Sequence, residues 1–559
     1  MCSGFWTSKK EFSMTKIKDM FKEIRNKQMR AAFYVVLLFF FIFIFIPGIV
    51  LFKNAFTLNS GAFSFNNVAS VFAGGKLRTA FAHSVNVSLL SALITTVLAF
   101  VLAYTVNFTN IPIWTKKTLR TLAVFPMLIP TITYGFAIIY SFGKNGLLTK
   151  LIGKQFFDFY GFKGLIFGYV IYTFPISFTL LTNTMAYIDR RYIVVCRLMG
   201  DSRLRSFFTA VIQPLLGTIA VSVVQSFFLA FTDFGIPASI GGRYTVVAGL
   251  LYNTMLGSLP DFHQGSVIAL CMLFPSIVSI LLLNYLQKFN VRYNKIAIND
   301  NQPDIFRDIL WTLVSVVICV LILSSFVVVF VAPFVAEWPY NNTFTLNHFV
   351  SVFNDKSLVR VFKNSLVMSF FTAVFGTILV YASALVSARN KGLIHGTKII
   401  EAIAQVSNTI PRMVLGISFL LAFRKTPLHN TLAILVCCNL VHFFATPYLM
   451  MKASLDKMNI SWETTARILG DNWIKTVARI ITPNVMRTHL EIFCYLFING
   501  MVTVSAVVFL AGARTMVITT KIQELQHFAK FNEIFILSLL ILAVNLVIKS
   551  VKGIVNRKQ

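Results

Sequence analysis

The chain has 559 residues, of which 57% are hydrophobic and only 13% are charged, and it contains 57 phenylalanines. Soluble domains carry about 25% charged residues, so this composition excludes an ordinary soluble protein. The formal net charge of +30 would suit nucleic-acid binding. The basic residues, however, lie in short segments between long apolar runs, which favours a membrane protein without a nucleic-acid partner. The seven cysteines show no metal-ligand spacing, so we predict neither a metal site nor a disulfide framework.

Long apolar stretches predict the fold class. About 20 apolar residues cross a bilayer as a helix. With the amino terminus placed in the cytoplasm, most lysines and arginines also fall on the cytoplasmic side, as the positive-inside rule requires. We therefore expect an all-α polytopic membrane protein with both termini in the cytoplasm. The twelve predicted spans are 31–52, 84–107, 121–142, 164–185, 209–234, 265–286, 309–333, 365–387, 399–423, 430–451, 488–511 and 533–548.

The chain contains an internal repeat, and its two copies have the same order of spans and motifs. Ser84 and Pro130 each have a counterpart 281 residues later, at Ser365 and Pro411. Because each repeat contains an even number of spans, both have the same orientation, which predicts two parallel pseudo-symmetric six-helix halves. The predicted segments are a basic cytoplasmic leader at 1–30, a first half at 31–290, a cytoplasmic linker at 291–308 and a second half at 309–559.

One polar loop occurs in both halves. The segment from Arg197 to Ser202 reads Arg-Leu-Met-Gly-Asp-Ser, and Arg-Ile-Leu-Gly-Asp-Asn follows 270 residues later. Glycine permits a sharp reversal, and the following Asp201 or Asp471 can cap the next helix. We expect a helix–turn–helix knob in each half, the first knob at 190–208 and the second knob at 460–480. A single copy would fit an ordinary charged loop, but two matched copies favour docking surfaces for two copies of one partner.

Both knobs resemble the EAA loop of ABC importer permeases of the binding-protein-dependent type. In that family a Glu-Ala-Ala triplet precedes a glycine, and a proline follows the glycine by about thirteen residues. The second knob has this spacing, the first is one residue longer, and both triplets are degenerate. The resemblance assigns ATPase coupling to Val194, Val195, Cys196, Gly200, Asp201, Pro214, Thr464, Thr465, Ala466, Gly470, Asp471 and Pro483.

The resemblance implies the type I ABC importer permease fold in a bacterial cytoplasmic membrane. It also implies two copies of a cytoplasmic ABC ATPase on the knobs and an extracytoplasmic solute-binding protein. ATP and magnesium would bind to the ATPase subunits, with no cofactor in this chain. The sequence itself contains no G-x-x-x-x-G-K-[ST] phosphate loop. We therefore predict a transport subunit that is not an enzyme.

Further motifs bear on the substrate. Thr232–Pro237 and Ser505–Leu510, with Phe142–Thr149 and Tyr172–Pro175, are similar to fused permeases for ferric iron or 2-aminoethylphosphonate. The run Phe159–Phe162 favours the phosphonate branch, so we predict uptake of 2-aminoethylphosphonate or a related organophosphonate. The alternative is a ferric iron importer, followed by a polyamine or thiamine importer. A secondary transporter would need more acidic residues within the spans, and a membrane enzyme would need a polar catalytic cluster there.

Arg412 lies within the ninth predicted span, directly after Pro411. Charges within spans are costly and indicate function by default, and a guanidinium suits an anionic substrate. Alternatively, Arg412 pairs internally with Glu401 or Glu491, or lies near the membrane edge. Asp233 could meet a cationic substrate, but we favour a cap on a short helix that begins near Ile236. The predicted pathway residues are Arg412, Asp233, Thr232, Thr503 and Ser505.

Overall fold

The computed structural model describes residues 27–58, 61–154, 158–189, 191–286, 288, 304–337, 340–389 and 394–558. Most of the predicted leader and linker lies outside the described residues, as does residue 190 at the start of the first knob.

The described part of the first half is entirely helical apart from its loops and one isolated β-bridge. Its elements are α2 (Lys27–Phe40), η1 (Phe41–Phe45), α3 (Ile46–Ala55), α4 (Asn66–Ala73), α5 (Lys76–Phe108), α6 (Ile113–Val124), η2 (Phe125–Leu128), α7 (Thr131–Phe142), α8 (Leu147–Ile152), α9 (Phe162–Met185), α10 (Arg191–Leu198), α11 (Arg203–Phe207), η3 (Phe208–Ile212), α12 (Gln213–Thr232), α13 (Gly235–Ile240), α14 (Val247–Leu256) and α15 (Phe262–Leu286).

The second half repeats this order and adds a small antiparallel hairpin, in which Val335 pairs with Phe344. Its elements are α16 (Ile305–Val331), η5 (Ala332–Phe334), β1 (Val335–Glu337), β2 (Asn341–Phe344), α17 (Asn347–Asn354), α18 (Lys356–Arg389), α19 (Ile394–Thr409), α20 (Arg412–Phe423), α21 (Leu432–His442), α22 (Ala445–Asp456), α23 (Ser461–Ile468), α24 (Trp473–Thr476), η6 (Val477–Ile481), α25 (Thr482–Asn484), α26 (Met486–Val502), η7 (Val507–Phe509), α27 (Ile518–His527) and α28 (Phe531–Lys558).

Each of the twelve predicted spans has a helical counterpart. Within the described residues, eight helices are long and apolar enough to cross a membrane alone. Three further spans are pairs of helices, bent by 107° in the third span, 102° in the ninth and 56° in the tenth. The eleventh span corresponds to α26, which has only 17 residues. The all-α polytopic prediction is confirmed, but four spans are shorter or more bent than the apolar runs suggested.

The first helix of each half packs against the other half. Phe40 of α2 meets Phe444, with ring centroids 4.5 Å apart, and α3 packs on α20. Correspondingly, α16, the first helix of the second half, packs on α5 and α7 of the first half. Ser315 of α16 and Thr105 of α5 share a hydrogen bond of 2.7 Å. The two halves of the sequence are therefore interlocked in space.

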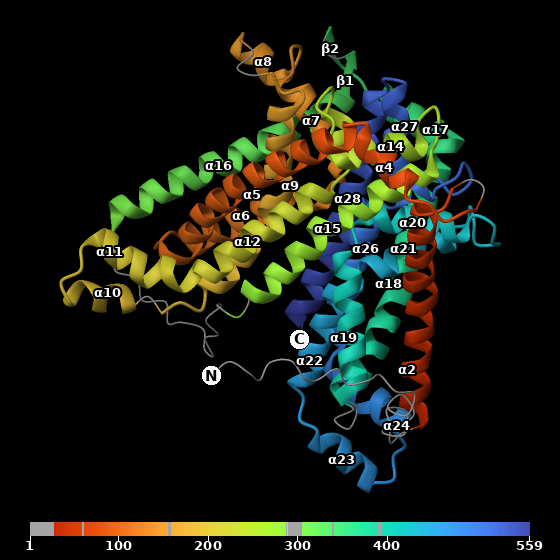
Figure 1. The fold of residues 1–559 in the computed structure, drawn as a ribbon. Helices are drawn as coiled ribbons and strands as arrows, with labels where there is room; N and C mark the ends of the chain where they lie inside the picture. The colour runs from red at the N-terminus through yellow and green to blue at the C-terminus, as the bar shows by residue number, and fades with distance from the viewer. Residues whose placement is uncertain are drawn as a thin grey trace, which may run out of the picture.

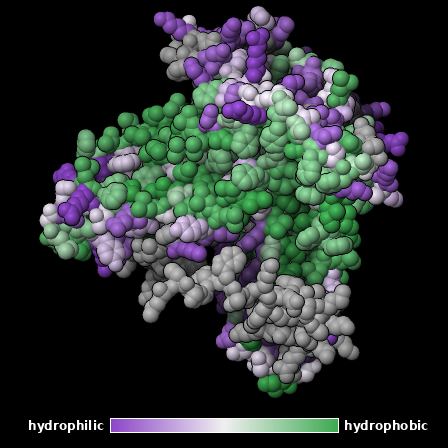
Figure 2. All heavy atoms as spheres, viewed as in Figure 1, coloured by the Kyte–Doolittle hydropathy of each residue, from purple (hydrophilic) through white to green (hydrophobic). Residues whose placement is uncertain are grey.

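The molecule has the shape of a fork (Figure 1). The first knob, α10 and α11, and the second knob, α23 and α24, form the two tips, while α8, the β-hairpin, α14, α17 and α27 lie at the opposite end. Figure 2 shows that the arms are mainly hydrophobic on the visible face, whereas hydrophilic residues gather at the tips and at the opposite end. This distribution fits a protein whose middle lies in lipid.

Two glycines allow the bent spans to pack closely. A Cβ on Gly135 of α7 would lie 2.0 Å from Ser239 Oγ, and one on Gly416 of α20 would lie 2.5 Å from the Ala506 carbonyl oxygen. Both contacts join the outer part of a bent span to the segment that follows the fifth or eleventh span. The two halves therefore use the same close approach, as the repeat requires.

Candidate functional site

The two knobs contain the same turn. Gly200 and Gly470 adopt φ values of +89° and +87°, a left-handed conformation that a Cβ disfavours. The amide of the aspartate that follows each glycine donates a 3.0 Å hydrogen bond to the preceding helix, at Cys196 O in the first knob and Ala466 O in the second. The two turns therefore have the same geometry, because a glycine in the left-handed conformation reverses the chain in each knob.

The caps differ from the prediction. Ser202 Oγ and Asn472 Oδ1 accept the capping bonds of the following helices, at 3.3 and 2.9 Å, and both residues have extended backbone. The prediction that Asp201 and Asp471 provide these caps was wrong, because their amides still bond back to the preceding helix. The cap residue of a helix has an extended backbone, and the first such residue is the one after each aspartate, Ser202 or Asn472. Asp201 instead forms a 3.1 Å ion pair with Arg205.

Each knob continues into a membrane helix through a five-residue π-helix. These are η3 in the first half and η6 in the second, and Pro214 and Pro483 follow within the first turn of the next helix. Because proline has no amide to donate, it fits the start of a helix better than the interior. The helical path from knob to span is unbroken in the first half, so motion of that knob would be passed to the membrane helix.

The tips of both knobs expose large apolar side chains at matching positions. Leu198 and Met199 are 83% and 81% exposed, and their counterparts Ile468 and Leu469 are 80% and 79% exposed. The predicted triplet residues of the first knob lie on α10, partly or fully exposed. In the second knob Thr464 and Thr465 are exposed, whereas Ala466 is buried. Repeated apolar tips at the polar end of the molecule suit a partner protein.

If the knobs couple an ATPase to transport, as their resemblance implies, Gly470→Val should reduce transport at least tenfold, because a β-branched side chain is strained at φ +87° and a left-handed residue costs about 1–2 kcal/mol even without branching. Gly553→Val is the matched control, since a Cβ there meets nothing within 4 Å. Uptake by proteoliposomes with the partner ATPase gives the measurement. Equal uptake by both variants would show that the turn is dispensable.

The second knob has an ion pair that the sequence analysis did not identify. Arg389 Nε at the end of α18 lies 2.8 Å from Glu463 Oε1 of α23, and the two side chains are 2% and 15% exposed. Arg389 also donates to Met458 O at 3.3 Å. By the repeat offsets, the corresponding residues of the first half are Phe108 and Ile193. The second knob is thus held by a buried charge pair where the first has apolar residues.

The third and ninth spans break in the same way. Pro130 and Pro411 each precede the second helix of a pair, with φ near −60° and ψ of 143°. The first residue after each break is Thr131 in one half and Arg412 in the other. Broken helices inside a membrane protein are tolerated where other protein groups or water satisfy the backbone. Such breaks are a frequent place for substrate sites.

Asp233 is buried and acts as a cap. Its Oδ2 accepts from the Ile236 amide and its Oδ1 from Thr131 Oγ1, both at 3.0 Å. This is the geometry of the favoured cap interpretation. The predicted pathway residues Thr232, Thr503 and Ser505 are also buried, so in this conformation none of these four side chains faces open space.

Arg412 lies among neutral side chains. Its Nε donates to His442 Nε2 at 2.9 Å, and its guanidinium carbon lies 5.6 Å from the centre of the Phe443 ring. Tyr172, from α9 of the first half, is within hydrogen-bonding reach of Arg412. The side chains of Arg412, His442 and Tyr172 are all partly exposed. Arg412 therefore connects both halves and remains accessible.

The predicted internal partners of Arg412 are engaged elsewhere. Glu401 forms an ion pair with Lys452, and Glu491 lies 3.8 Å from Lys552. The alternative in which Arg412 pairs with Glu401 or Glu491 was wrong, because both carboxylates lie toward basic residues on other helices.

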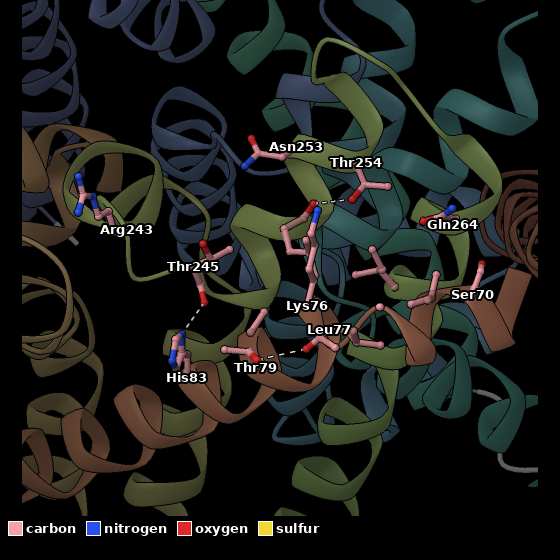
Figure 3. A pocket seen from close by; sticks show the side chains of 16 residues that line it. Ser70, Lys76, Leu77, Thr79, His83, Arg243, Thr245, Asn253, Thr254 and Gln264 are labelled. Carbon is pink, nitrogen blue, oxygen red and sulfur yellow. Dashed lines mark hydrogen bonds between the residues drawn. The ribbon is translucent and has the colours of Figure 1, made fainter.

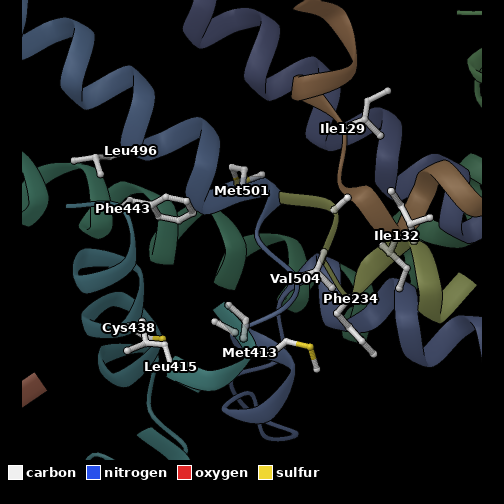
Figure 4. Packing of buried hydrophobic residues seen from close by; sticks show 14 of the residues in the cluster. Ile129, Ile132, Phe234, Met413, Leu415, Cys438, Phe443, Leu496, Met501 and Val504 are labelled. Carbon is white, nitrogen blue, oxygen red and sulfur yellow. The ribbon is translucent and has the colours of Figure 1, made fainter. Parts of the chain in front are cut away.

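Four buried apolar side chains occupy matching positions of the two halves, one of them next to Arg412 in the sequence. Ile132 and Phe234 of the first half correspond by the repeat offsets to Met413 and Val504 of the second, and each is at most 2% exposed. Figure 4 shows these four side chains where the bent spans meet the ends of α12 and α26. We call them the apolar seal. The sequence alone does not indicate this cluster, because single apolar residues do not stand out within apolar spans.

The end opposite the knobs has a cavity of about 970 Å³ (Figure 3). Lys76, His83 and Arg243 line it together with uncharged residues, and no carboxylate is among its lining residues. The His83 ring lies 3.0 Å from Thr245 O through its Nδ1 and stacks on Tyr244 at 3.9 Å. The sequence analysis did not identify this basic cavity, because its residues come from separate segments.

Comparison with known proteins gives matches in both halves. Residues 95–295 and 384–559 match a family model described as "Binding-protein-dependent transport system inner membrane component". Ferric transport system permease protein FbpB of Actinobacillus pleuropneumoniae is 24% identical, over 91% of this chain and 75% of its own length. Putative ferric transport system permease protein FbpB 1 of Haemophilus influenzae is 24% identical, over 92% of this chain and 82% of its own length. Molybdenum transport system permease protein ModB of Escherichia coli is 22% identical, over 30% of this chain and 75% of its own.

Proposed function

The chain belongs to the family of binding-protein-dependent transport system inner-membrane components, and we propose that it is the permease of an importer for ferric iron. The family assigns it to the inner membrane as a multi-pass subunit of an ABC importer, which implies ATPase and solute-binding partners. The support for iron is the similarity to two ferric permeases over more than nine-tenths of this chain. The predicted phosphonate has no such support, so its ferric alternative is the better reading.

The matched knobs support a mechanism. We propose that one ATPase subunit docks on each knob, that both knobs and both chain termini lie in the cytoplasm, and that ATP binding draws the two arms of the fork together. The continuous helical path through η3 would pass this motion to the first half, and η6 with the short helix α25 would pass it to the second. Rigid-body rocking of two halves is a common basis of alternating access.

The apolar seal bears on which side of the membrane the pathway opens to in this conformation. In the present conformation the four buried side chains close the centre, while the knobs lie apart at the tips of the fork. We propose that this is the state open to the cytoplasm, and that closing the arms separates the seal. The basic cavity at the opposite end (Figure 3) would then contact acidic residues of the loaded binding protein.

Uptake by proteoliposomes tests the substrate. The permease is reconstituted with its ATPase and binding protein, and ⁵⁵Fe(III) in citrate or phosphate buffer, 2-aminoethylphosphonate and putrescine are supplied in separate assays with ATP inside. We expect ATP-dependent accumulation of iron only. Accumulation of 2-aminoethylphosphonate without iron would show that the predicted phosphonate is the substrate and ferric iron is not. Uptake that survives ATP depletion but collapses with the ion gradient would indicate a secondary transporter.

A further inference from the structure

Arg412 has no carboxylate partner within the described residues. No ion pair of 4.0 Å or less includes it, and its polar contacts are His442 and Tyr172. Asp233 contributes to the same electrostatic environment, but both of its oxygens already accept hydrogen bonds from Thr131 and Ile236. A positive charge within the spans is therefore compensated only by neutral groups and one engaged carboxylate. Such an arrangement is costly unless it serves a ligand.

The surroundings suit an oxyanion. The guanidinium donates to the second half through Nε, which bonds to His442, and it also interacts with Tyr172 of the first half. Tyr495 of α26 lies in the same environment and is also partly exposed. Guanidinium and hydroxyl groups donate to carboxylate and phosphate oxygens, and the planar fork of arginine fits them well.

Exposed polar residues lie between Tyr172 and the first knob. On α9 the exposed polar side chains Thr179 and Asn183 follow Tyr172 toward the first knob, at helical spacing. The apolar seal is next to Arg412 in sequence, because Met413 is one of its four residues and is buried. A ligand at Arg412 would therefore rest against the closed seal and face the end from which it leaves.

A bare ferric ion does not suit this environment. The guanidinium would repel a trivalent cation, and no group of three or more metal-binding side chains occurs in the part of the chain that the structure describes. We infer that Arg412 and Tyr172 form an oxyanion site, and that cargo passes the membrane as an anionic complex. In the case of iron, this inference rests on the proposed function and names its substrate class, a ferric ion with carboxylate or phosphate ligands.

Dual-label uptake tests the inference in the complete transporter. Proteoliposomes receive ⁵⁵Fe(III) on the binding protein, with ³²P-phosphate or ¹⁴C-citrate or neither, and ¹⁴C-2-aminoethylphosphonate in a separate assay. We expect iron to enter with an oxyanion in fixed proportion and not to enter without one. Uptake of 2-aminoethylphosphonate alone would disprove iron as cargo but support the oxyanion site. Iron uptake without an oxyanion, or uptake of putrescine, would overturn the inference.

Variants separate binding from folding. Arg412→Gln should lower oxyanion-coupled uptake at least tenfold and abolish the rise in melting temperature that citrate or phosphate gives the solubilised complex. Arg412→Lys, which keeps the charge but not the fork, should retain part of both. Arg424→Gln, at the other end of the same helix and exposed, should behave like wild type. An unchanged ligand-induced melting shift in Arg412→Gln would contradict the assignment.

Discussion

Aspartate in place of Leu198 and Met199, or of Ile468 and Leu469, should weaken binding of the ATPase at least a hundredfold. All four side chains are about four-fifths exposed, so their replacement should change the stability of the fold little. Burying one such side chain in an interface is worth about 1.5–3 kcal/mol, and a hundredfold change in affinity is about 2.8 kcal/mol. Co-purification of the ATPase and its binding curve on the detergent-solubilised permease measure the loss.

A matched control comes from the opposite end of the molecule. Leu259 is 90% exposed in the loop between α14 and α15, and Leu259→Asp should leave ATPase binding unchanged. Loss of binding in either knob variant alone would show that both knobs are needed. If both knob variants recover the ATPase as wild type does, the knobs are not its docking surfaces.

Loss of Arg389 should destabilise the permease by about 3–5 kcal/mol, because Glu463 would lose its ion pair with Arg389 where both side chains are largely shielded from solvent. Arg389→Met with Glu463→Met should restore most of this stability, since apolar groups can replace a buried pair. The double variant also imitates the first half, where Phe108 and Ile193 occupy the corresponding positions. Thermal unfolding of the solubilised protein measures both effects.

Transport adds a second readout for this ion pair. The double variant should couple ATP hydrolysis to uptake as the wild type does if the pair only holds the second knob in place. A single Arg389→Met variant as stable as wild type would contradict the buried pairing.

The sequence predicts the repeat, the spans and the glycine turns, because each depends on local residue type. Proline alone does not specify the breaks, since Pro175 and Pro275 lie inside the continuous helices α9 and α15, whereas Pro130 and Pro411 each separate two helices. The caps were placed one residue early, because aspartate, serine and asparagine are all good caps and only backbone geometry selects among them. The exchange of first helices, the Arg389–Glu463 pair and the apolar seal depend on contacts between distant segments, which a pattern along the chain does not specify.

The similar proteins support the ferric alternative better than the predicted phosphonate, and the structure shows why the motifs do not distinguish the two. The motifs around Thr232–Pro237 and Ser505–Leu510 proved to be buried turns and caps at the ends of α12 and α26. Their residues determine backbone geometry and need not contact cargo. Arg412, which lies outside those motifs, is the accessible charged residue at the break. Short motifs therefore indicated the family well and the cargo poorly.

The distance between the two knobs tests the central proposal most directly. Spin labels at the matching knob positions Leu204 and Ile474, which are 83% and 56% exposed and are not among the four docking side chains, can be followed by pulsed electron paramagnetic resonance in proteoliposomes with the ATPase and the loaded binding protein. We expect the distance to shorten when ATP is trapped with vanadate and to lengthen again after hydrolysis. An unchanged distance in a complex that still transports cargo would contradict the proposal.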